Sequence, residues 1–307
     1  KQGRPPQNHQ RGVMSRILLI ALGGGALAGL ASLAIVSGLP GGLLVVYLAP
    51  LPLFLIGLAH GLKSETIAAT TGVITAGLIG GAVSGMLFAL VHALPVWIVV
   101  RQALIRWQVA DGSGAHREEW TPAGTILGML AVLAVALFGV AYLLALGEEG
   151  GLRGMILSLL DKVFTYMMPG LQDGKRIDML NSLSALFPGY LGLSWVVMTI
   201  INGTVALVLL NRMKVSLRPT LRISTLTLPD QLSWYLIGAA VLALIGSLSG
   251  QGDLEYIGRN MVMILALPFF FLGLAVIHNL VILTSFPGML LVVFYMVLLM
   301  SGWIGPL

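Results

Sequence analysis

Two histidines and two asparagines are the residues of this chain best placed to do chemistry, because each interrupts an apolar stretch. His92 lies within the uncharged stretch 66–100, and Asn202 lies within a later apolar run. His278 and Asn279 stand together between two further apolar runs. Polar groups at membrane depth are costly unless they are satisfied, so their presence there points to a ligand or to a structural partner. These four residues are the candidate ligand-binding residues.

Each candidate also has a structural interpretation. His92 lies one turn before Pro95 and could hydrogen-bond a carbonyl group that the proline leaves without a donor. Contact with a ligand and a role in a proton relay are the other interpretations of His92. Asn202 could instead join two helices by hydrogen bonding, and His278 with Asn279 could cap a helix end at the surface. The residues alone do not choose between these roles.

Several common chemistries lack the residues that they need. The chain has no Cys and no His-Glu-x-x-His spacing, so we predict neither a metal nor a cofactor. It has no P-loop, and no Ser–His or paired-Asp arrangement stands out. No acidic residue lies within a predicted span, which argues against a proton- or sodium-coupled carrier that uses a buried acid. We expect a protein that is not an enzyme.

The composition indicates an integral membrane protein. Hydrophobic residues make up 57% and charged residues 9% of the 307 residues, whereas a soluble domain carries about 25% charged residues. Uncharged runs that could each form a helix of about 20 residues, the length that crosses a bilayer, recur along the chain. We predict an all-α, polytopic transmembrane helical bundle with about nine spans and one or two interfacial amphipathic helices.

The predicted organisation has four parts. Residues 1–16 form a basic N-terminal arm, residues 17–146 hold five spans, and residues 188–307 hold about four more. Between them, residues 147–187 carry apolar side chains at helical spacing opposite a polar face, which favours helices lying in the membrane interface. A gating lid is the alternative role for that segment.

Charge predicts the orientation of the chain. Lys and Arg are concentrated in the arm, in the loop after the fourth span and in the loop after the sixth, which places these segments in the cytoplasm. The net charge of +5 is then a consequence of topology and requires no nucleic acid partner. We predict a multi-pass protein of the bacterial cytoplasmic (inner) membrane with a cytoplasmic N-terminus.

Small residues recur at four-residue spacing in the first span and in the hairpin at 66–100. In lipid, such lines let helix backbones approach each other closely. They make the lipid bilayer and a membrane-protein partner the expected partners of the chain. The candidate helix-packing or docking residues are Ala21, Gly25 and Gly29; Gly72, Ala76 and Gly80; and Gly77, Gly81 and Gly85.

The segment before this hairpin is read as a loop. Ser64 suits the N-cap position of the helix that follows. Glu65 is assigned to the last position of the loop at residues 60–65.

Residues 51–63, with the Thr- and Ala-rich span that follows, resemble the YybS-like bacterial family of predicted membrane proteins of unknown function, as do residues 273–278 and 290–295. The resemblance implies a distant relation to the S-components of energy-coupling-factor transporters. S-components bind a vitamin or a metal within a small helical bundle and dock on a membrane subunit through small residues of their first helix. By this resemblance, the line that begins at Ala21 would be the docking face.

The function expected from these observations is small-molecule binding or transport by a non-enzymatic, S-component-like membrane protein. The alternative is a structural or accessory subunit that packs against a larger membrane protein complex.

Overall fold

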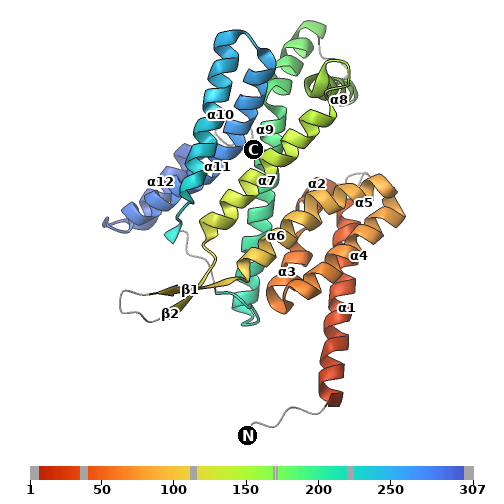
Figure 1. Cartoon of the computed structure of the whole chain (residues 1–307), viewed down its shortest axis with the longest axis vertical. Helices are drawn as coiled ribbons and strands as arrows, with labels where there is room; N and C mark the ends of the chain where they lie inside the picture. The colour runs from red at the N-terminus through yellow and green to blue at the C-terminus, as the bar shows by residue number, and fades with distance from the viewer. Residues whose placement is uncertain are drawn as a thin grey trace. The chain divides into compact units, whose positions relative to one another are not determined.

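The chain folds into two compact, predominantly helical units in the computed structural model (Figure 1). The first unit contains Lys1–Ile126 and Val197–Leu221, and the second contains Leu127–Val196 and Arg222–Leu307. The structure describes residues 7–34, 41–110, 116–168, 170, 172–219 and 225–300. The all-α prediction is confirmed.

The first unit is built from helices of 6 to 26 residues, a π-helical segment and one β-hairpin. Its elements are α1 (Gln7–Ser32), α2 (Gly42–Tyr47), α3 (Leu51–His60), α4 (Leu62–Gly80), α5 (Ala82–Phe88), the π-helix η1 (Ala89–Ala93), α6 (Leu94–Ala103) and the antiparallel hairpin β1 (Arg106–Ala110) and β2 (His116–Trp120). The hairpin was not predicted, because its residues were read as a loop. The first turn of α7 and the end of α9 complete the unit.

Glycine and proline set the helix boundaries of the first unit. Gly61 and Gly81 have φ angles of 89° and 86°, which side chains disfavour, and they separate α3 from α4 and α4 from α5. Pro50 precedes α3, and Pro95 lies in the first turn of α6, directly after the π-helix η1. Between these boundaries the helices enclose a core that includes Phe54 of α3.

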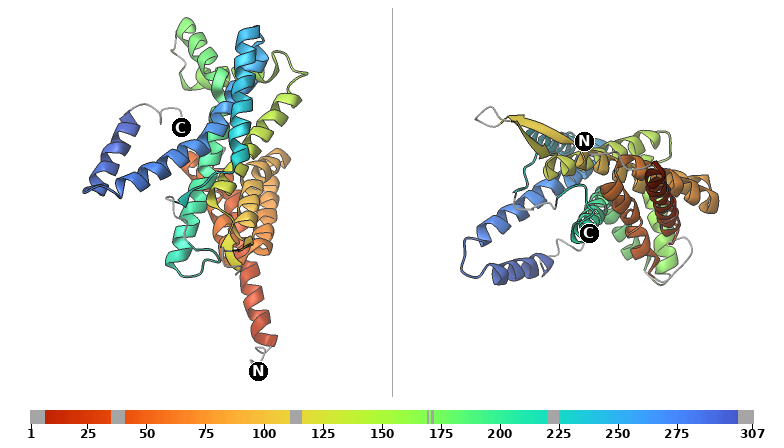
Figure 2. Two further views of the ribbon diagram at one scale, coloured as in Figure 1. Left: turned by 60° about the vertical axis from the view of Figure 1, so that its left-hand side comes forward. Right: turned by 90° about the horizontal axis from the view of Figure 1, so that it is seen from below.

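The second unit contains most of α7 (Ala123–Leu144), followed by α8 (Gly151–Met167), the N-terminal part of α9 (Asp173–Arg212), α10 (Asp230–Ser249), α11 (Gly252–Val281) and α12 (Pro287–Met300). Figure 2 shows α10 and α11 as an antiparallel pair. Helix α9 is a single helix of 40 residues with Pro188 inside it. The separate amphipathic helix and span predicted on either side of this proline are therefore one continuous element.

Within the described ranges, seven helical segments are long and apolar enough to cross a membrane: Met14–Ser32, Gly42–His60, Ala82–Ala103, Ala123–Leu144, Asp173–Arg212, Asp230–Ser249 and Gly252–Val281. The predicted count of about nine also included α4 and α12. Helix α4 contains Lys63, Glu65 and several threonines, which lower its hydropathy, and α12 has 14 residues in the described part of the chain. Helix α1 begins at Gln7, so the later part of the predicted N-terminal arm is helical.

Candidate functional site

The small residues of α1 pack against α4 of the same chain. A Cβ atom added to Gly25 would collide with the carbonyl oxygen of Ala68, and one added to Gly29 would lie 2.5 Å from the carbonyl oxygen of Gly72. Ala21 is fully buried. The face that the resemblance implied for docking on another subunit is therefore occupied by α4. A partner could use it only by displacing that helix.

The two lines of the hairpin also face neighbours within the first unit. A Cβ atom on Gly72 would lie 2.5 Å from the Phe88 ring, and one on Gly85 would lie 3.0 Å from the Cα atom of Gly77. Ala76 is fully buried. Gly80 lies against Ser84, and Gly81 forms the turn between α4 and α5.

Asn202 connects α9 to the end of α2. Its side-chain amide donates to the carbonyl oxygen of Tyr47 at 2.8 Å and to that of Met198 at 2.8 Å. The amide of Leu51, which would bond Tyr47 in an unbroken helix, donates instead to Leu48 because the chain turns before Pro50. The Asn202 side chain thus supplies the donor that the helix break removes. Its Oδ1 atom is buried and has no hydrogen-bond partner among the described residues.

A second buried asparagine, Asn260 in α11, has a similar role in the second unit. Its Nδ2 donates to the carbonyl oxygen of Ala185 at 3.0 Å, and its Oδ1 accepts from the amide of Gly189 at 2.7 Å, beside Pro188. The side chain is fully buried. Asn260 was not among the predicted candidates, because the predicted span began after it. Extending the apolar run by one residue would have included it.

Arg218 is a third buried polar residue with a structural role. Its guanidinium donates to the carbonyl oxygen of Ala103, the last residue of α6, at 3.1 Å, and to that of Thr121 at 2.6 Å. Burial lowers the pKa of this guanidinium. The side chain joins the end of α6 to the residues that lead into α7.

His92 is buried in the π-helix η1 and keeps one unsatisfied ring nitrogen. The residue is 4% exposed, and its ring lies 5.5 Å from that of Phe88, between centroids. No described residue hydrogen-bonds its Nδ1 atom. The structure therefore does not place a carbonyl group freed by Pro95 against this nitrogen. Short π-helical segments occur often at functional sites.

Glu65 is a buried carboxyl group that the sequence analysis assigned to a loop. Helix α4 begins at Leu62, with Gly61 at its N-cap, so Ser64 does not cap it and Glu65 lies in its first turn. The residue is fully buried, and no described residue hydrogen-bonds either carboxyl oxygen. No local signal predicts this, because Lys63 and Glu65 read as an ordinary polar helix start.

The Glu65 side chain fits against α3 because residue 57 is a glycine and has no Cβ atom. A Cβ atom on Gly57 would lie 2.8 Å from Val100 of α6 and 3.1 Å from the Cβ atom of Glu65. Glu65 therefore sits where α3, α4 and α6 meet.

His278 and Asn279 lie near the C-terminal end of α11. His278 Nδ1 lies 2.8 Å from the carbonyl oxygen of Leu274, and its Nε2 lies 3.5 Å from the hydroxyl of Tyr295 in α12. Asn279 is exposed. His278 and Asn279 belong to the second unit, whereas His92 and Asn202 belong to the first.

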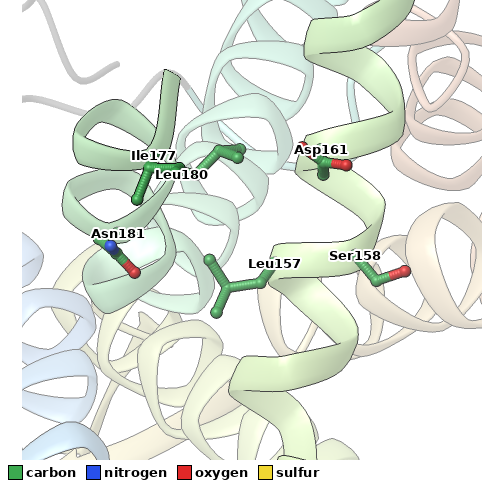
Figure 3. Close-up of a pocket in the computed structure, with 6 residues that line it drawn as sticks. All are labelled: Leu157, Ser158, Asp161, Ile177, Leu180 and Asn181. Carbon is green, nitrogen blue, oxygen red and sulfur yellow. The ribbon is translucent and has the colours of Figure 1, made fainter. Parts of the chain in front are cut away.

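A cavity of about 320 Å³ lies between α8 and α9 in the second unit (Figure 3). In Figure 3, Leu157 points towards α9 and Ser158 points away from it. The acidic group at its edge, Asp161, is paired with Arg176 at 2.6 Å. The cavity is mainly apolar, so it offers few polar contacts to a ligand.

The described residues contain no cluster of three or more His, Asp or Glu that could hold a metal ion. Some of the buried polar side chains in this part of the chain bond backbone atoms, and others keep polar atoms without a partner. Asn202, Asn260 and Arg218 have backbone partners, whereas Glu65 and the His92 Nδ1 have none. The second pair is the best candidate for contact with a ligand or an ion.

Comparison with protein families identifies the chain. The family model of predicted membrane proteins DUF2232 matches residues 113–304, which is more than half of the chain, so the chain belongs to this family. The matched region contains Asn202, Asn260 and His278 and ends beyond α12, while Glu65 and His92 lie before it. No curated protein and no solved structure gave a match.

Proposed function

We propose that this DUF2232 membrane protein binds a small molecule, or helps to move one, through the helices of its first unit, without enzymatic turnover. One observation carries the proposal. Three buried side chains of this unit keep polar atoms without a partner among the described residues: the Glu65 carboxyl oxygens, His92 Nδ1 and Asn202 Oδ1.

Unsatisfied buried polar atoms support binding because they are costly. A buried group without a hydrogen bond costs about 1–3 kcal/mol, and native proteins rarely retain several in one region. A ligand that donates hydrogen bonds would satisfy the Glu65 and Asn202 oxygens. The Asn202 Nδ2 atom donates a hydrogen bond to the carbonyl oxygen of Tyr47, and this bond fixes the orientation of the unpartnered Oδ1 atom.

The finer features of the proposal come from the sequence. The resemblance to S-components supports a bundle that binds its ligand within the membrane. The concentration of Lys and Arg in alternate loops supports a bacterial cytoplasmic membrane with the N-terminus in the cytoplasm. Because Gly25 and Gly29 pack on α4, the proposal does not use α1 as a docking face.

Native mass spectrometry of the full chain, extracted from its own membranes in mild detergent, tests this function. We expect a bound small molecule at a constant ratio, retained by Glu118→Gln and lost or weakened in Glu65→Gln and His92→Ala. Glu118 is the control because it is exposed and paired with Arg106. A folded protein without bound molecules, or equal retention by all three variants, would contradict the proposal.

A structural or accessory subunit is the second candidate function. Helix glycines of the second unit leave open faces, since a Cβ atom on Gly139, Gly238 or Gly273 would meet nothing within 4 Å. Flat faces of this kind let another membrane helix approach. A protein partner at constant ratio in the same spectra, released by Gly238→Leu and unaffected by Glu65→Gln, would favour this function.

A further inference from the structure

Glu65 differs from the other acidic side chains whose surroundings the structure describes. Glu118 is exposed and pairs with Arg106 at 3.1 Å, Glu255 is near Arg259 at 3.1 Å, and Asp161 pairs with Arg176. The Glu65 side chain is fully buried and has no such partner among the described residues. Its carboxyl group sits where α3, α4 and α6 meet.

The charged groups on the elements packed around Glu65 point elsewhere. Arg218 donates to two backbone carbonyls, and the Arg101 guanidinium lies 5.6 Å from the centroid of the Trp97 ring. His92, in η1, is buried with its own Nδ1 unsatisfied. Among the basic side chains whose burial the structure describes on α1, α3, α4 and the end of α9, four more are exposed: Arg16, His60, Lys63 and Arg212.

An ionised carboxylate in this position would be strongly disfavoured. Removing a charged carboxylate from water costs several kcal/mol even after relaxation, unless a cation or several donors compensate. Such a group normally becomes neutral instead. A metal cation is a poor substitute for the proton, because it needs several oxygen ligands, and the described residues contain no cluster of acids and histidines around Glu65.

Glu65 lies near the N-terminal end of α4, so the path for a proton between its carboxyl group and water at the α3–α4 turn is short. Glu65 lies in the first turn of the helix, two residues after the exposed Lys63 and close to the turn at Gly61. One helical turn rises by about 5.4 Å. A small opening of the turn between α3 and α4 would expose the carboxyl group to water on that side.

We propose that the Glu65 carboxyl group is a proton-binding site within the helical bundle, which takes up a proton from water and releases it again on the α3–α4 side. In this exchange the O–H bond of the acid breaks, the proton passes to water, and the carboxylate remains. The inference goes beyond small-molecule binding, since it holds whether or not the protein carries a ligand. It also reverses the expectation from the sequence, which argued against coupling to protons because no buried acid was apparent.

A hydrophobic carbodiimide tests the site in the unmodified protein. The reagent, dicyclohexylcarbodiimide, adds to a protonated carboxyl group, and the adduct rearranges to a stable N-acylurea with no atoms lost. With the full chain in lipid vesicles, we expect the peptide containing Glu65 to be modified on the order of tenfold faster than that containing Glu118. Modification should decline as the pH is raised. Equal rates at the two residues, or no pH dependence, would overturn the proposal.

A hydrophobic reagent could modify Glu65 faster only because it accumulates in lipid. Infrared difference spectroscopy needs no reagent and detects the protonated Glu65 carboxyl group directly. Raising the pH should remove a carbonyl stretching band of a protonated carboxyl group, and this band should shift in D₂O. The band should be present in the wild type and in Glu118→Gln but missing in Glu65→Gln. A wild-type spectrum without such a band would refute the site, even if native mass spectrometry found a bound molecule. Conversely, a band without any bound molecule would support the site and contradict the proposed function.

Discussion

The side-chain amide of Asn260 spans one turn of the backbone of α9. Its Oδ1 atom accepts a hydrogen bond from the amide of Gly189 at 2.7 Å, and its Nδ2 donates to the carbonyl oxygen of Ala185 at 3.0 Å. Ala185 and Gly189 are the acceptor and donor of one regular helical turn. Asn260 therefore stabilises α9 beside Pro188, where a proline inside a helix removes a donor and clashes with the preceding turn.

Removing this amide should destabilise the second unit. We expect Asn260→Ala to lower the free energy of unfolding by about 1–3 kcal/mol, because two buried backbone groups lose a partner. The measurement is thermal unfolding of the full chain in detergent, followed by circular dichroism. Asn181→Ala is the control, since Asn181 is an exposed asparagine of α9, the helix that Asn260 contacts. A melting temperature equal to that of the control would contradict the assigned role.

The contact between α1 and α4 predicts opposite effects for two neighbouring glycines. Gly25→Ala should destabilise the protein by about 1–3 kcal/mol, because its methyl group would collide with the carbonyl oxygen of Ala68. Gly23→Ala should be neutral or stabilising by up to about 1 kcal/mol, since nothing lies within 4 Å of its Cβ position and alanine favours a helix. Thermal unfolding of both variants in the same detergent decides the matter. If Gly25→Ala were as stable as Gly23→Ala, the close approach of the two helices would be wrong.

The two hydrogen bonds of Arg218 predict that lysine cannot replace arginine there. A guanidinium can reach the carbonyl oxygens of Ala103 and Thr121 at once, whereas an ammonium on a flexible stem cannot reproduce this fork. We expect Arg218→Lys to cost about 1–3 kcal/mol of stability. Limited proteolysis near the start of α7 should become faster in this variant. Arg212→Lys, at an exposed position, should leave both measurements unchanged.

Substitution of His92 should weaken ligand binding without lowering the stability of the protein. Because Nδ1 has no partner among the described residues, His92→Leu removes an unsatisfied polar atom and should leave the melting temperature unchanged or higher. Phe88→Ala removes a side chain that is 1% exposed, and it should cost about 3–5 kcal/mol. Native mass spectrometry of the same samples should show ligand retention lost in His92→Leu. A destabilised His92→Leu protein would mean that the histidine is structural.

Composition and local pattern were enough to predict the class of the protein. Long uncharged runs are typical of membrane-spanning helices, and glycines and prolines, as at Gly61 and Gly81, determine many helix boundaries from local backbone geometry. The amphipathic segment of α8 was visible from its periodicity. The continuous helix through Pro188 was not, because the compensating amide of Asn260 lies far away in the sequence.

Tertiary structure alone decided which polar and small residues have partners. Asn202 and Tyr47 are 155 positions apart, so no local pattern could show that the amide satisfies that carbonyl. The glycines of α1 predicted that another helix packs closely against them, but they did not identify that helix. The fold shows that it is α4. Glu65 is the clearest case. Its neighbours in the sequence are those of a solvated helix start. Its burial comes from the packing of α4 against α3, where Gly57 lies next to the Glu65 side chain, because burial depends on what packs against a residue and not on what precedes it.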